Sequence, residues 1–172
     1  MKSIFAIAAF LWAATPALAD GIVLSGSIQH PGPITMAQLR AMPQVEVKVD
    51  QKTEKGNFTG DFRGVLLWTL VNKAGLVNGP QRHAVLLHGI VVSASADHYG
   101  ALISLGEIHP ELGNGQVILA TEKDGQPLAQ PILVVPGDAK AARDVRGVTS
   151  VDVRSDGGGA MHGGHRTSDH LK

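Results

Sequence analysis

The 172-residue chain contains no cysteine. Its absence excludes disulfide scaffolds, thiolate zinc sites, iron–sulfur clusters and cysteine nucleophiles. The chain also has no excess of positive or negative charge, because 15 lysines and arginines balance 15 aspartates and glutamates. Nucleic acid binding needs an excess of basic residues that neutralise phosphates. We therefore expect no nucleic acid partner.

Long hydrophobic runs are missing outside the N-terminus. Residues 1–2 are a short positive start, and residues 3–14 form an apolar run that is followed by Thr15-Pro16 and the A-x-A pattern of residues 17–19. This order is typical of a signal peptide cleaved after Ala19. The run is shorter than the roughly 20 residues of a membrane-spanning helix, although an uncleaved anchor is the alternative. We expect a periplasmic or secreted chain with no stable membrane insertion after cleavage.

Aromatic residues are scarce in the chain that follows the signal peptide: Phe58, Phe62, Trp68 and Tyr99. Forty-four per cent of all residues are nevertheless hydrophobic and only 17% are charged, which is too apolar for a disordered chain. The length fits one ordinary domain. A core of valine, leucine, isoleucine and alanine suits a sheet-rich domain with small helices.

The hydrophobic pattern predicts an α+β, mainly β domain over residues 20–154. Alternation of apolar and polar residues is clearest at Val45, Val47 and Val49. Asp124-Gly125 is a strong hairpin signal. Strands are expected at residues 22–28, 45–49, 56–63, 84–87, 90–96, 117–121, 132–135 and 145–153, with His88-Gly89 as an interruption. Helices are expected at residues 35–42 with Thr35 as the cap, at 66–74 closed by Gly75, and at 108–112 after a capping box of Ser104 and Glu107.

Residues 155–172 differ in character from the rest, since glycine, histidine and polar residues leave almost nothing to bury. We expect a disordered tail. Its histidines, His162, His165 and His170, could chelate a divalent ion such as copper, zinc or nickel. Weak adventitious binding, or none, is the alternative, because ordering a flexible chelate costs chain entropy.

Four stretches, in order, resemble the sulfite oxidase-type molybdopterin-binding domain in its short exported form. They are residues 24–28 with 33–39, residues 62–71 (FRGVLLWTLV) with Ala74-Gly75-Leu76, residues 96–107 with Asp97-His98-Tyr99, and residues 118–138 with the DGQPL and LVVPGD segments. The resemblance implies the fold of that family, molybdopterin as cofactor, and an oxidoreductase with a periplasmic redox partner.

The chain departs from the family at the metal. In active members a cysteine before the aromatic-x-G-V segment supplies the thiolate that ligates molybdenum. The equivalent region, residues 47–60, has none. A carboxylate or a lysine cannot replace a soft thiolate without changing the redox chemistry of the metal. We therefore expect no molybdenum catalysis of the sulfite oxidase type, and no catalytic residue is assigned.

Asp97-His98-Tyr99 is the first candidate binding segment. Histidine titrates near neutral pH and tyrosine can donate a hydrogen bond to an anion. The resemblance places this stretch at the border of the family's pocket. The alternative is a turn with a buried tyrosine whose hydroxyl finds a partner.

Arginines are the second kind of candidate. Arg63, next to Gly64, could bind a phosphate or an oxyanion in a bidentate way. Arg143 and Arg146, near Lys140, could form a small anion site after the last strands. Solvated surface arginines are the alternative in each case. The predicted cofactor-binding residues are thus Arg63, Asp97, His98, Tyr99 and Arg143.

Two functions follow from these residues. In the first, the domain is enzyme-like and binds a pterin or another anionic small molecule. In the second, it is a non-catalytic periplasmic module that holds a small ligand or a partner protein, with a metal-chelating histidine tail. Stoichiometric molybdenum, or its absence, separates the two.

Overall fold

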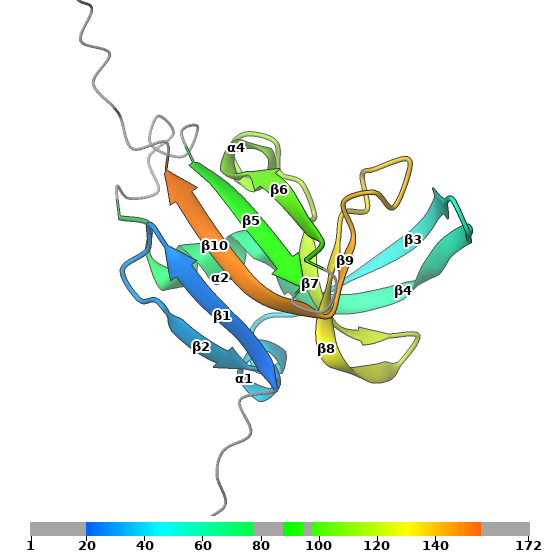
Figure 1. Cartoon of the computed structure of the whole chain (residues 1–172), viewed down its shortest axis with the longest axis horizontal. Coiled ribbons are helices and arrows are strands. Elements are labelled where there is room, and N and C mark those ends of the chain that lie inside the picture. Colours follow the sequence, from blue (N-terminus) through cyan, green and yellow to red (C-terminus); the bar gives the residue numbers. More distant parts are fainter. Residues whose placement is uncertain (1–19, 78–87, 95–97, 156–172) are drawn as a thin grey trace, which may run out of the picture.

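The computed structural model describes residues 20–77, 88–94 and 98–155, which form two five-stranded sheets and short helices (Figure 1). The first sheet has the order β2 (Gly32–Thr35), β1 (Gly21–Gly26), β10 (Val148–Ser155), β5 (His88–Ala94), β6 (Gly100–Ser104). The second has the order β3 (Val45–Thr53), β4 (Gly56–Leu66), β7 (Ile118–Lys123), β8 (Gln126–Val134), β9 (Val145–Arg146). The helices are α1 (Met36–Arg40), α2 (Leu67–Ala74) and α4 (Leu105–Ile108).

The predicted class, α+β and mainly β, is confirmed. Neighbouring strands pair antiparallel, except that β1 runs parallel to β10. The chain passes from the second sheet to the first at Gly147, between β9 and β10, where φ is +65°. The single strand expected at residues 145–153 is therefore two strands, one in each sheet. Among the described residues, no helix is long and apolar enough to cross a membrane.

The larger core lies among the first sheet, the helices and inward residues of the second sheet such as Leu119 and Leu133. Inward residues of β1, β5, β6 and β10 pack there against Met36 and Leu39 of α1, Leu70 and Val71 of α2, and Leu105 of α4. A smaller cluster covers one face of the second sheet, and it contains Phe58, Phe62, Val49, Ile118 and Val134. The rings of Phe58 and Phe62 stack with centroids 5.1 Å apart. Buried aliphatic residues thus supply most of the core.

Three local predictions are confirmed. Thr35 begins α1 with a capping box, in which its hydroxyl accepts from the backbone of Gln38 and the Gln38 side chain accepts from the backbone of Thr35. Gly75 follows α2 with a φ of +74°. Asp124 and Gly125 both have positive φ, as the tight turn between β7 and β8 requires.

Other local predictions are wrong. His88 and Gly89 belong to β5, because both pair in register with β10, and they do not interrupt a strand. Ser104 makes no side-chain capping bond, and α4 covers residues 105–108 where the sequence favoured 108–112. Strand β6 was not predicted at all. Ser155, predicted to begin the tail, is the last residue of β10 and pairs with His88. The predicted strand at residues 84–87, the rest of the predicted tail and the predicted signal peptide lie outside the described residues.

Candidate functional site

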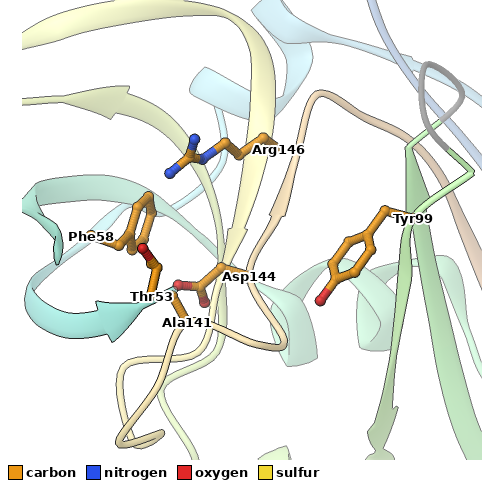
Figure 2. Close-up of a pocket in the computed structure, with 6 residues that line it drawn as sticks. All are labelled: Thr53, Phe58, Tyr99, Ala141, Asp144 and Arg146. Carbon is orange, nitrogen blue, oxygen red and sulfur yellow. The ribbon is translucent and has the colours of Figure 1, made fainter. Parts of the chain in front are cut away.

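A pocket of about 260 Å³ lies where the second sheet meets the start of β6. Its lining residues come from three places: the β3–β4 hairpin, the segment just before β6, and the segment that ends in β9 (Figure 2). They are Thr53, Phe58, Tyr99, Ala141, Asp144 and Arg146. Residues far apart in the chain meet here because β9 and β10 connect the two sheets directly.

Asp144 is the buried acid of this pocket, with 8% of its surface exposed. Its Oδ1 accepts a hydrogen bond of 2.8 Å from the backbone of Val135. Its Oδ2 is buried and has no hydrogen-bond partner in the described part of the chain. Burial raises the pKa of Asp144 to about 6, assisted by the charge of Asp138 and opposed by the Val135 N–H and by Arg146 and Arg143. One carboxylate oxygen is thus left for another donor.

Arg146 is the cation of the pocket. Its guanidinium carbon lies 5.2 Å from the centre of the Phe58 ring, and Figure 2 shows the side chain directed toward that ring. Among the described residues, none forms an ion pair or hydrogen bond with this guanidinium. Its donors are therefore open to a ligand, while the ring fixes the direction of the side chain.

Gln51 fastens the pocket wall to β3. This residue is 3% exposed, and its Nε2 donates to the backbone oxygens of Val135 at 2.7 Å and of Asp138 at 2.9 Å. The backbone N–H of Ala141 donates to the oxygen of Lys52 at 3.2 Å. The segment that carries Asp144 is thereby held against the hairpin that carries Phe58.

Arg143, a predicted binding residue, fastens the same segment to α4. Its guanidinium donates to Asp138 at 2.6 and 2.8 Å and to Glu107 at 2.9 and 3.1 Å. These bonds raise the pKa of Arg143 further and lower the pKa of Asp138. Arg143 does not line the pocket, its donors are engaged by two carboxylates, and its contact with an anionic ligand stays a prediction.

Tyr99 lines the pocket as its place in the sequence suggested. The side chain is 44% exposed, and its hydroxyl donates to the backbone oxygen of Ala142. His98 is exposed with a φ of +55° and is not part of the described lining. The alternative of a buried tyrosine in a turn does not describe Tyr99, although the hydroxyl does find a partner.

The other predicted residues lie elsewhere. Arg63 is exposed on β4 and forms an ion pair with Glu122 at 3.7 Å. It follows Phe58 by five positions along a regularly paired strand, so its side chain is on the opposite face of the sheet from the pocket. Asp97, and the tail residues His162, His165 and His170, lie outside the described residues, and their predicted roles stay predictions.

Sequence reasoning missed Asp144, Thr53 and Phe58 as pocket residues. The sequence places Arg146 beside Arg143 in a possible anion site, but Arg146 is not among the predicted cofactor-binding residues. Asp144 stands directly before the strand start at Val145, where an acid is ordinarily exposed, so its position in the sequence gives no signal of burial. Its burial comes from the fold of residues 135–144 onto β3, which no periodicity shows.

Comparison with known proteins decides the family. Residues 21–156 match the family described as the oxidoreductase molybdopterin binding domain. The chain belongs to this family. Among solved structures, this molybdopterin-domain chain is similar to the sulfane dehydrogenase SoxCD from Paracoccus pantotrophus, with a TM-score of 0.63 and 16% sequence identity. The similarity covers 82% of this chain and 40% of that one. At this identity it shows the fold alone, and no curated protein matches.

The residues present do not fit the molybdenum centre of the sulfite oxidase type. Residues 47–60, where the resemblance places the ligating cysteine, form a regular hairpin that pairs without a break from Val45 opposite Gly64 to Thr53 opposite Gly56. The chain has no thiol, and the pocket offers only hard oxygen donors such as Asp144. Thiolate is the ligand that sets this metal's chemistry, and a carboxylate does not substitute for it.

Proposed function

We propose that this molybdopterin-domain chain is an exported protein that binds a small molecule with an anionic group in the pocket of Asp144 and Arg146. It does so without thiolate-ligated molybdenum catalysis. The observation that carries the proposal is the Arg146 guanidinium, which lines a pocket and has no ion-pair partner in the described chain. An arginine held in direction by a ring is suited to a carboxylate or a phosphate.

The pocket limits the size of the ligand. Sites for drug-sized molecules measure about 300–1,000 Å³, and this pocket measures about 260 Å³. A ligand the size of a small organic acid, or one portion of a larger molecule such as a pterin, fits this space. The ring of Phe58 and the methyl group of Ala141 provide the apolar wall.

The pocket residues have separate chemical roles in this proposal. Arg146 binds the anionic group. Asp144, whose pKa is about 6, is mostly ionised at neutral pH and accepts a hydrogen bond. Arg143 and Gln51 act on the ligand only through the wall that they hold in place.

Nuclear magnetic resonance of the mature chain tests this function. The ¹⁵N-labelled protein is titrated with phosphate and, separately, with acetate. We expect both anions to shift the amide signals of residues 53, 58, 99 and 141–146. Arg146→Gln should abolish these shifts.

Arg154→Gln is the matched control, because Arg154 is an exposed arginine of the first sheet that pairs with Asp152. It should leave the shifts unchanged. Shifts that persist in Arg146→Gln, or that centre on Arg63, would contradict the proposed site. An absence of shifts with any small anion would favour the alternative, a module that binds a partner protein.

A further inference from the structure

We propose that the ligand of this pocket is zwitterionic, with a cationic N–H group that binds Asp144 beside the anionic group that binds Arg146. A small aliphatic α-amino acid is the simplest molecule of this class. The inference rests on the proposed function, since it assumes the same pocket, and it names the ligand chemistry that the pocket selects.

The carboxylate of Asp144 and the guanidinium of Arg146 carry opposite charges. Together they favour a ligand that has both a cationic and an anionic group. The Oδ2 of Asp144 is a buried acceptor without a donor in the described chain. The guanidinium of Arg146 is exposed and has no ion-pair partner among the same residues. The two residues are separated only by Val145, which is fully buried. Both residues line the same pocket, so the two groups are available to one ligand (Figure 2). A molecule that satisfies both needs a donor and an acceptor close together.

The charges around the pocket favour a cationic donor over a neutral one. The described pocket lining contains one carboxylate, that of Asp144, and one guanidinium group, that of Arg146. A purely anionic ligand adds a further negative charge close to an already buried carboxylate. A zwitterion brings a positive group to Asp144, and a buried charge is stabilised when it is paired.

Part of the remaining wall is apolar and can contact an aliphatic side chain, beside the polar side chains of Thr53 and Tyr99. Phe58 and Ala141 present apolar surface in the pocket. The volume of about 260 Å³ is large enough for a small aliphatic amino acid. L-Valine is therefore the probe, and three molecules of nearly the same shape each lack one feature. Isovalerate lacks the amine, α-hydroxyisovalerate replaces it with a hydroxyl, and isobutylamine lacks the carboxylate.

Isothermal titration calorimetry of the mature chain with these four probes, above the pKa of Asp144, tests the inference. L-Valine should bind at least about tenfold more tightly than each of the other three, because a hydrogen bond to a charged group has about this effect on an affinity. This comparison uses the unaltered protein, so it does not depend on the folding of any variant.

Variants then test which residue binds the amine of the ligand and which binds its carboxylate. Asp144→Asn keeps the acceptor for Val135 and removes the charge, so it should weaken L-valine about tenfold or more and leave isovalerate unweakened. Arg146→Gln should weaken both ligands. Arg154→Gln should weaken neither.

The outcomes separate this inference from the proposed function. Isovalerate or α-hydroxyisovalerate binding as tightly as L-valine would overturn the zwitterion and leave an anion site in place. All four probes could bind with dissociation constants weaker than about 1 mM, while phosphate still shifts the amide signals of the Arg146 pocket. That result would overturn the zwitterionic ligand alone. Isobutylamine binding alone would overturn both.

Discussion

Replacement of Asp144 by asparagine should make the protein's stability less dependent on pH. Burial raises the pKa of Asp144 from 3.8 to about 6 in the folded chain. At about 1.36 kcal/mol per pKa unit, this difference corresponds to about 3 kcal/mol. The folded state binds this proton more tightly than the unfolded state, so this carboxyl group makes stability fall as pH rises through the interval from 3.8 to about 6. Above that interval its full destabilising effect is present.

Asparagine has nearly the same shape, keeps an oxygen for the Val135 N–H, and does not titrate. The free energy of unfolding of Asp144→Asn, minus that of the wild type, should therefore increase by about 3 kcal/mol between about pH 3 and pH 7. Any change in stability that the asparagine causes equally at every pH cancels, because only the change of this difference with pH is compared. Urea unfolding followed by circular dichroism at a series of pH values measures it, with Arg154→Gln as a control that should track the wild type through the Asp144 interval.

A difference that changes by less than about 0.5 kcal/mol across this pH range would refute the reasoning, since it would mean that Asp144 titrates as in the unfolded chain. Confirmation would show that the pocket contains a carboxylate that is unfavourable to folding without a ligand. Perturbed carboxyl groups of this kind concentrate at functional sites.

Two further predictions concern the frame of the site. Gly64→Ala should destabilise the protein by about 3 kcal/mol or more, because its Cβ would lie 2.2 Å from the backbone oxygen of Leu119. Gly137→Ala is the control, since its Cβ would have nothing within 4 Å, and it should be close to neutral in the same urea unfolding assay. Equal effects of the two substitutions would contradict this prediction. Arg143→Gln should lower stability by about 1–2 kcal/mol at neutral pH, reduced by the partial exposure of these side chains, and Arg143→Lys should not restore it, because a lysine cannot bind both carboxylates in a bidentate way. Since Arg143 lowers the pKa of Asp138, this variant should also lose less stability than the wild type as pH falls below about 4; equal losses in acid would contradict the prediction.

Much of the fold could be predicted from the sequence, because many local signals agree with the final structure. Alternation at Val45, Val47 and Val49 reports a strand that is covered on one face only. Thr35 and Gln38 form their capping box within four residues, so no tertiary contact is needed to predict it. Strand alternation and helix caps of this kind can be predicted from neighbouring residues, without knowledge of the tertiary packing.

The errors arise where pairing across the sheet overrides local preference. His88 and Gly89 are poor strand signals, yet both are held in β5 because β10 and β6 pair with it on either side. Ser104 has capping-box spacing to Glu107, but that carboxylate binds Arg143 instead of a backbone N–H. A competing ion pair with a residue 36 positions away cannot be read from spacing.

The site was predictable only in part for the same reason. Tyr99 belongs to a stretch shared with the family, and it lines the pocket. Arg63 lies beside the glycine of the FRGV segment, but that glycine serves a close approach of β4 to β7, and the arginine faces away. Asp144 becomes a pocket residue only because Gln51 draws residues 135–138 onto β3.

The molybdenum content of residues 20–172 tests the central claim most directly. The protein is purified from a bacterial periplasm that also contains active molybdoenzymes, with and without residues 155–172, and its metal and released pterin are measured against a member of the family that has the cysteine. The account predicts molybdenum far below one atom per chain in both forms, because no thiolate is present to ligate it. One molybdenum atom per chain, retained after removal of residues 155–172, would contradict the account and show that this fold holds the metal without a cysteine.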